Sequence, residues 1–242
     1  MRSRVLPCLV LELGMVDYAT ALGLQEEIVE ARIKGLIPDV LLLLEHPPTY
    51  TTGRLGYKEN LLVSEEELEQ KGIRLFRINR GGDITFHGPG QLVGYPILNL
   101  KDHGQDVFYY LRHLERLLID TLREWGIIAY QVPGLTGVWA EGKKIASIGV
   151  GIKRWVSFHG FALNITIDLN YFRWINPCGL NGEQITSMSQ LTQREIPGRI
   201  SQTLIQVFSQ LFELDCQGIE LEYLRELMAY GWQARVAAGQ AT

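Results

Sequence analysis

The sequence predicts an α+β fold, in which helices pack on a mixed, mostly antiparallel sheet. Three observations support this prediction. Short apolar and alternating runs, typical of strands, dominate the middle of the chain. Helical patterns lie near both ends, with one long helix between them. The strict alternation of strand and helix that would indicate a doubly wound parallel sheet is absent from the sequence.

The expected helices are defined by capping residues and by apolar spacing. Asp17 and Asp106 stand at N-cap positions, Ser64 and Glu67 form a capping box, and Gly126 ends the longest pattern. The helical patterns cover residues 17–34, a short segment from 64, 106–125, 198–214 and 218–230. In the first of these we expect Tyr18, Leu22, Val29 and Ile33 to share the buried face.

The expected strands are apolar runs or alternating segments bounded by turn residues. Residues 40–44 form an unbroken apolar run that is too short for most helices. Glu141 and Gly142 are typical of a hairpin turn between two strands. The strand patterns cover residues 5–13, 38–45, 73–79, 92–100, 127–132, 137–140, 145–152 and 155–168.

Length and composition indicate a globular protein. Of the 242 residues, 46% are hydrophobic and 21% are charged, which excludes an intrinsically disordered chain. No repeat or Ser/Pro-rich linker divides the sequence, so we expect residues 1–242 to form a single domain. The formal net charge of −4 argues against a generic nucleic-acid binder.

The same survey bears on where the protein is located, while the sequence is silent on its oligomeric state. No segment reaches the roughly 18 consecutive apolar residues of a membrane span. The apolar run after the basic N-terminus is too short for a signal-peptide core. The three cysteines show no CxxC spacing, so neither a disulfide framework nor a zinc site is indicated. We expect a cytoplasmic protein that binds no membrane, with a monomer as the default state.

The densest feature of the sequence is the stretch RGGDITFHGPGQ at residues 80–91. Its four glycines allow close approach of the backbone to a ligand, and polar side chains lie between them. The stretch therefore lines a pocket or forms an ordinary glycine-rich hairpin. It is neither GxGxxG nor a P-loop, so it indicates no nucleotide site.

Two further positions are candidates for catalysis. Lys143 and Lys144 follow the expected hairpin turn, and strand alternation sends them to opposite faces. A lysine held inward has its pKa lowered by desolvation and can act as a base, whereas two solvated turn lysines would be inert. Cys178 lies between Pro177 and Gly179, which suits an exposed nucleophile or a small buried hydrophobe.

Histidine positions divide into two groups. His87 and His159 each precede a glycine, which makes them the better pocket candidates. We interpret His46, His103 and His113 as structural or surface residues. No spacing of histidine, cysteine and carboxylate residues suggests a metal site.

Taken together, the motifs resemble the signature of the lipoyl(octanoyl) transferases. The matching strings stand in the order of that family between residues 80 and 188, and because the flanking length also fits, the resemblance covers most of the chain. They are RGGxxTxHGPGQ (80–91), GVW (137–139), KIASIG (144–149), HGFALN (159–164), NPCGL (176–180) and TSM (186–188).

The resemblance implies a fold and a reaction. The fold would be similar to the catalytic domains of biotin and lipoate protein ligases. The enzyme would move an octanoyl or lipoyl group from acyl carrier protein to a lysine amine, the first step of endogenous protein lipoylation. Its acceptors would be lipoyl domains of 2-oxoacid dehydrogenase complexes and the glycine cleavage H protein. It would need no cofactor.

The resemblance also implies roles for individual residues. Cys178 would form an acyl thioester, and Lys144 would activate it. The residues that would bind the acyl substrate are Arg80, Gly81, Gly82, Asp83, Ile84, Thr85, Phe86, His87, Ser147, Ile148, Gly149, Gly160, Phe161 and Ala162.

Two alternatives compete with this function, and the first of them uses the same fold. An ATP-dependent lipoate or biotin ligase would give Cys178 no role, and its glycine motif differs from the HGPGQ string. An inactive protein that only holds acyl chains would not require both Cys178 and Lys144. Transferase chemistry is therefore the function that we expect.

Overall fold

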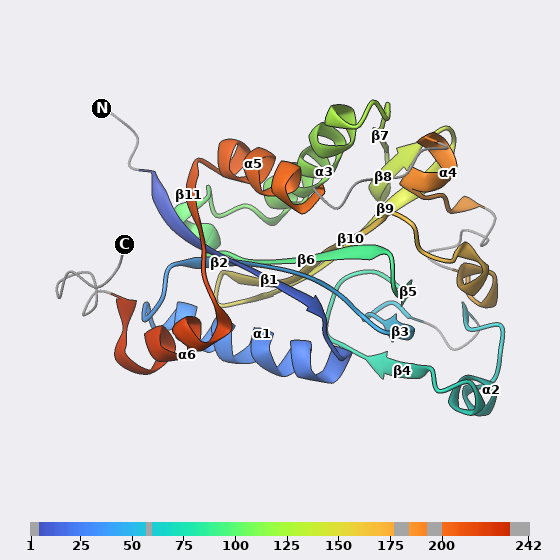
Figure 1. Cartoon of the computed structure of the whole chain (residues 1–242), viewed down its shortest axis with the longest axis horizontal. Helices are drawn as coiled ribbons and strands as arrows, with labels where there is room; N and C mark the ends of the chain where they lie inside the picture. Colours follow the sequence, from blue (N-terminus) through green and yellow to red (C-terminus); the bar gives the residue numbers. More distant parts are fainter. Residues whose placement is uncertain (1–4, 57–59, 177–183, 193–199, 233–242) are drawn as a thin grey trace.

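A mostly antiparallel sheet forms the centre of the computed structural model, which describes residues 5–56, 60–176, 184–192 and 200–232 (Figure 1). Within these residues the sheet has eight strands in the order β11-β1-β2-β6-β10-β9-β8-β7. β1 pairs in parallel with β2 and β11, and the other neighbours are antiparallel. The strands are β1 (Leu6–Met15), β2 (Asp39–Glu45), β6 (Gln91–Ile97), β7 (Tyr130–Val132), β8 (Leu135–Ala140), β9 (Lys143–Lys153), β10 (Val156–Asn164) and β11 (Leu214–Gly218). The predicted α+β class is confirmed.

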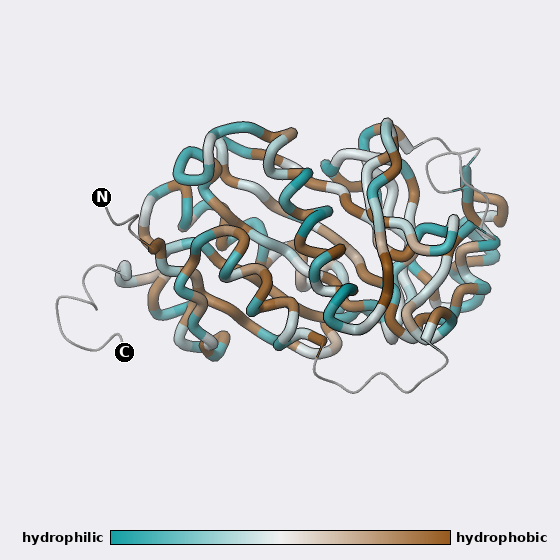
Figure 2. Tube along the Cα trace, turned by 90° about the horizontal axis from the view of Figure 1, so that it is seen from above, coloured by the Kyte–Doolittle hydropathy of each residue, from teal (hydrophilic) through white to brown (hydrophobic). Residues whose placement is uncertain are grey.

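Helices cover both faces of this sheet. α1 (Tyr18–Ile33) and α6 (Leu221–Tyr230) pack on one face, while α3 (Val107–Glu124) and α5 (Ile200–Phe212) pack on the other (Figure 1). Hydrophobic and hydrophilic residues are mixed along these helices (Figure 2), and the apolar residues of each helix pack in the clusters against the sheet. Two apolar clusters result, one on each side of the strands.

The expected caps are present. The Asp17 carboxylate accepts hydrogen bonds from two backbone amides of the first turn of α1, and Asp106 does the same for α3. Ser64 and Glu67 form the predicted capping box at α2 (Glu65–Gln70). The buried face of α1 is partly different from the prediction, because Leu22 is only half-buried and Ala21, Leu24 and Ile28 fill the core.

A second, three-stranded sheet has the order β4-β3-β5. It lies beside the start of β6 and the end of β10 (Figure 1). Its strands are β3 (Thr49–Thr52), β4 (Arg74–Arg77) and β5 (Ile84–His87). A third apolar cluster joins it to the 3₁₀ turn η3 (Leu169–Trp174). The remaining short elements are η2 (Leu100–Asp102) and α4 (Met188–Thr192).

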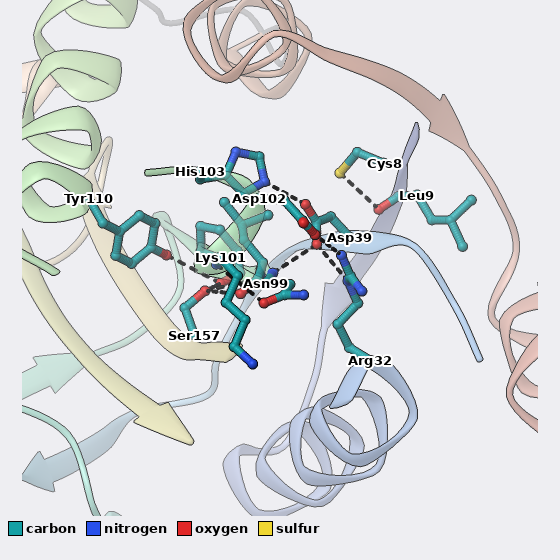
Figure 3. Close-up of polar contacts among 12 residues, drawn as sticks. Cys8, Leu9, Arg32, Asp39, Asn99, Lys101, Asp102, His103, Tyr110 and Ser157 are labelled. Carbon is teal, nitrogen blue, oxygen red and sulfur yellow. Dashed lines mark hydrogen bonds and ion pairs between the residues drawn. The ribbon is translucent and has the colours of Figure 1, made fainter. Parts of the chain in front are cut away.

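A buried carboxylate organises the polar contacts at the start of β2 (Figure 3). Asp39 is 1% exposed and accepts hydrogen bonds from Arg32 Nε at 2.7 Å and from the Asn99 backbone N–H at 2.9 Å. Its second oxygen lies 2.7 Å from His103 Nε2. His103 is therefore a structural partner of Asp39, and this agrees with the sequence-based interpretation of His103 as a structural or surface residue.

Candidate active site

A cavity of about 590 Å³ lies between the large and small sheets and the first turns of α3. It collects three stretches that are far apart in the sequence. The predicted site residues in its lining are Arg80, Gly81, Gly82, Asp83, Ile84, Thr85, His87, Lys144, Ser147, Ile148, Gly149, Gly160, Phe161 and Ala162. Apolar side chains of β6, α3 and the β7–β8 hairpin complete the wall, so the cavity suits a ligand with an apolar chain.

Phe86 is the described site residue that does not line this cavity. Its ring packs in the third apolar cluster, with centroids 5.0 Å from Tyr50 and 4.6 Å from Tyr171. Alternation along β5 explains this, because Thr85 and His87 point to the opposite face. Cys178 lies outside the described residues.

Glycines allow the loop before β5 and the strands of the large sheet to approach closely. The Gly81 N–H donates to the Val150 carbonyl at 2.8 Å and ties the loop to β9. A Cβ at Gly149 would lie 2.9 Å from the Gly81 carbonyl oxygen, and one at Gly160 would lie 2.2 Å from the Gly94 carbonyl oxygen. Side chains at these positions would separate the elements that form the cavity.

A chain of hydrogen bonds begins at Arg80, a buried guanidinium. Its Nη2 donates to the Thr51 carbonyl at 2.8 Å and to the Thr51 hydroxyl at 2.9 Å. Because that hydroxyl accepts from Arg80, its own proton is available to His87 Nε2 at 3.3 Å. His87 Nδ1 then donates to Gln91 Oε1 at 2.8 Å.

The chain continues to the backbone of Lys144. Gln91 Nε2 donates to Asn164 Oδ1 at 3.0 Å, and this fixes its Oε1 as the acceptor from His87. Asn164 Nδ2 donates to the Thr186 carbonyl at 2.9 Å. The Thr186 N–H donates to the Lys144 carbonyl at 2.9 Å. We refer to this path below as the Arg80–Lys144 chain.

Lys144 is buried, with an exposed fraction of 6%, whereas Lys143 is exposed. The predicted alternation of the two lysines is confirmed. The Lys144 ammonium lies 5.1 Å from the centre of the Trp139 ring, within cation–π range. Its aliphatic stem passes over Gly137, where an added Cβ would be 2.5 Å from Lys144 Cε and 3.2 Å from Nζ.

Three histidines surround the polar part of the cavity in their neutral form. Burial lowers the pKa of His46 to about 4 and that of His159 to about 3. Burial, and then the nearby His46, hold the pKa of His87 well below its ordinary value. His46 and His87 serve here as neutral hydrogen-bonding groups, and none of the three imidazoles adds charge beside Arg80.

His46 lies behind the cavity wall and is structural. Its Nδ1 is 2.7 Å from the Val16 carbonyl, which can only accept, so Nδ1 carries the proton. Its Nε2 then accepts from the Tyr95 hydroxyl at 2.7 Å. Burial raises the pKa of Tyr95 well above its usual range, so this hydroxyl stays protonated.

Two buried polar atoms of the lining make no hydrogen bond within the described residues: the Thr85 hydroxyl and His159 Nδ1. Such atoms are costly unless a ligand or water satisfies them. The cavity therefore combines an apolar wall, a buried lysine and polar atoms that a bound molecule can engage. This arrangement can hold an acyl chain and carry out proton transfer beside it.

Residues outside the predicted list also build the site. Thr51, Asn164 and Thr186 belong to the Arg80–Lys144 chain. Asn164 and Thr186 stand within the quoted motifs, whereas Thr51 lies in a strand that the sequence did not predict.

Comparisons with known proteins agree with these features. The family model described as the lipoyl protein ligase A/B catalytic domain matches residues 17–210. An octanoyltransferase of Solibacter usitatus (strain Ellin6076) is 50% identical over 208 residues, which cover 86% of this chain and 94% of that protein. An octanoyltransferase of Geobacter metallireducens (strain ATCC 53774 / DSM 7210 / GS-15) is 50% identical over 189 residues, covering 78% and 85% of the two chains.

Solved structures resemble the fold at lower identity. A lipoate-protein ligase A bound with ATP superposes with a TM-score of 0.73 at 20% identity, covering 92% of this chain and 94% of that one. A biotin protein ligase from Aquifex aeolicus gives a TM-score of 0.52 at 13% identity, covering 85% and 70%. These similarities concern the fold alone.

Proposed function

The chain belongs to the lipoyl protein ligase A/B catalytic domain family. We propose that it transfers an octanoyl or lipoyl group through a thioester on Cys178, with Lys144 as the proton acceptor and donor. Acyl transfer in protein lipoylation is the function supported by its octanoyltransferase relatives, and a ligase is not better supported. We propose octanoyl acyl carrier protein as donor. The proposed acceptors are lipoyl domains of 2-oxoacid dehydrogenase complexes and the glycine cleavage H protein.

In the first half-reaction, the Cys178 thiolate attacks the carbonyl carbon of the donor thioester. A new carbon–sulfur bond forms, the bond to the carrier thiol breaks, and the carrier thiol leaves with a proton. Lys144 accepts the Cys178 proton before attack and supplies the proton to the leaving thiol. An unperturbed cysteine is only a few per cent thiolate near neutral pH, so a neighbouring base raises the reactive fraction.

In the second half-reaction, the lysine amine of the acceptor attacks the Cys178 thioester. An amide bond forms, the amine loses a proton, and Cys178 leaves as a thiol. Lys144 is the proposed acceptor of that proton. Both attacks pass through a tetrahedral intermediate with a negatively charged oxygen, and each hydrogen-bond donor preorganised for that oxygen raises the rate roughly 10²–10³-fold.

The placement of Lys144 carries this proposal. The lysine is 6% exposed, lines the apolar cavity and is bridged through its backbone to Ile185. Because burial disfavours an ammonium, a buried lysine is better suited than a solvated one to act as a base.

The test is an assay that separates activated from unactivated donors. Octanoyl carrier protein and an apo lipoyl domain should give octanoylated domain with ATP and magnesium omitted. Free octanoate with ATP should give essentially none, since a free acid has no leaving group. Cys178→Ala should abolish the thioester and the product, and Lys144→Arg should stall, because arginine does not act as a base at physiological pH.

Lys143→Arg is the matched control, because Lys143 is exposed on the opposite face of β9, and it should retain activity. Acylation that persists in Cys178→Ala would refute the cysteine intermediate. Strict ATP dependence with the free acid, retained in that variant, would establish the ligase reaction instead.

The proposal includes the organisation of the protein. We propose that residues 1–242 act as one catalytic domain, as a cytoplasmic monomer without a cofactor. No helix in the described part of the chain has the length and apolar character needed to span a bilayer. Light scattering after size-exclusion chromatography should give the mass of one chain, 27.4 kDa.

A further inference from the structure

α3 carries a carboxylate on its buried face. Glu115 is 0% exposed and lies among the leucines that pack α3 on β8 and β9. A carboxylate is costly to bury unless it is hydrogen-bonded and paired. Glu115 satisfies this requirement with one partner on its own helix and one on the neighbouring strand.

The two oxygens of Glu115 have different partners. Oε2 accepts from Arg112 Nη1 at 2.5 Å, and the Arg112 side chain is half exposed to solvent. Oε1 accepts from the Gly137 backbone N–H at 3.2 Å. The carboxylate therefore connects α3 to the strand position over which Lys144 lies.

Gly137 is the link between the carboxylate and the lysine. Its φ of +131° is a conformation that favours glycine, and its Cα faces the end of the Lys144 side chain. The position that a Cβ would occupy is 3.2 Å from Lys144 Nζ. By accepting the hydrogen bond from the Gly137 N–H, Glu115 fixes the glycine backbone in the position that leaves room for the Lys144 side chain.

We infer that Glu115 is a positioning residue for Lys144: it fixes the backbone of Gly137 beneath the lysine and stabilises the ammonium that forms when Lys144 accepts a proton. The inference rests on the proposed function of Lys144 as a base. A base oriented by a third group is a common arrangement around an activated nucleophile. A buried carboxylate near an ammonium favours its charged form, because the two opposite charges attract.

Other charged and titratable groups also face the region around Lys144. Arg112 offsets part of the Glu115 charge from α3, and β8 has no charged side chain between residues 135 and 140. The described groups of the cavity wall and of the adjoining turn are Arg54, Arg80, Asp83, His87, His159, Tyr18, Tyr95, Glu141 and Lys143. A change confined to Glu115 leaves all of these in place.

Glu115→Gln tests the charge without removing the acceptor for Gly137. The measurement is the titration of Lys144 by NMR on protein labelled with ¹³C at lysine Cε, with the Lys144 signal assigned by its loss in Lys144→Arg. The midpoint should fall in Glu115→Gln, because removing the opposite charge makes the ammonium less favourable. Asp120→Asn is the matched control, since it removes a carboxylate from the same helix that pairs with Arg116 and Arg123, and it should leave the midpoint unchanged.

Arg112→Gln is a second variant at a half-exposed position, and it should shift the midpoint in the opposite direction, because the Glu115 charge is then less compensated. In Glu115→Gln the acid limb of the pH profile of kcat should move with the Lys144 midpoint, while KM stays within about twofold. A purely structural role would move neither the titration nor this limb.

An unchanged Lys144 midpoint in folded Glu115→Gln and in Arg112→Gln would overturn the inference. The proposed function fails differently: shifted midpoints together with full acyl transfer in Lys144→Arg would show that Glu115 tunes a lysine that the reaction does not use.

Discussion

Replacing Gly137 by alanine should displace Lys144 while leaving every ionisable group in the protein. The added methyl would lie 2.5 Å from Lys144 Cε and 2.7 Å from the Ala146 carbonyl oxygen. Carbon atoms in contact are normally about 3.5–4.0 Å apart, so the lysine must move by at least about 1 Å. A misplacement of about 1 Å can lower the rate about 100-fold.

Two assays are needed, because the substitution also strains the backbone. Gly137 has a φ of +131°, so alanine and the close contacts together should cost about 1–3 kcal/mol of unfolding free energy in urea. Gly142→Ala is the matched control. Gly142 has a φ of +77° in the same hairpin but has nothing within 4 Å of its Cβ position. It should lose stability without losing the rate of acyl transfer.

The two variants together isolate the position of the lysine. Gly137→Ala should lower kcat about 100-fold, and Gly142→Ala should lower it less than about threefold. A folded Gly137→Ala protein with a normal kcat would refute this prediction, because catalysis would then not depend on the position that Lys144 takes over Gly137.

Two further predictions concern stability. Asp39→Asn should lower the unfolding free energy by about 3 kcal/mol in urea, since it weakens the contacts to Arg32 and His103 (Figure 3). Asp39 does not line the cavity, so kcat should be unchanged. A stable Asp39→Asn protein with a strongly reduced kcat would contradict this purely structural role. The second prediction is pH-dependent. Unfolded His46 takes up a proton below about pH 6.5, whereas in the native state its pKa is lowered to about 4. The resulting stability is fully present above about pH 6.5 and is lost as the pH falls toward 4. Between pH 7 and pH 5 this histidine should cost roughly 2 kcal/mol, and a His46→Gln variant with an equally steep pH dependence would refute it.

Long, strongly patterned elements could be predicted from the sequence, whereas short ones could not. The apolar run in β2 and the amphipathic pattern of α3 identify themselves locally. β3 and β5 have four residues each, and they are strands only because they pair with each other across more than thirty residues of chain. β11 likewise exists through its parallel pairing with β1, which no local pattern reveals.

The candidate site shows the same division. The motif residues 80 to 87, 144, 147 to 149 and 160 to 162 converge on the cavity, except for Phe86, which packs in the third apolar cluster. Glu115 stands in no motif. A signal was nevertheless present, because Glu115 lies four residues after Leu111 and three before Leu118, on the apolar face of the helix. A lone carboxylate at such a position indicates a buried partner.

The direction of the Arg80–Lys144 chain explains why its members have these residue types. Arginine can only donate, so Arg80 fixes the start, and a carbonyl can only accept, so Lys144 fixes the end. Every group between accepts on one side and donates on the other, as a hydroxyl, a neutral imidazole, two side-chain amides and the main chain of Thr186 do. A protonated His87 would donate from both nitrogens, and the Thr51 hydroxyl would then face two donors. Because burial lowers the pKa of His87, its imidazole is neutral and can accept from Thr51 while it donates to Gln91, which keeps one direction along the chain from the glycine-rich loop to the lysine.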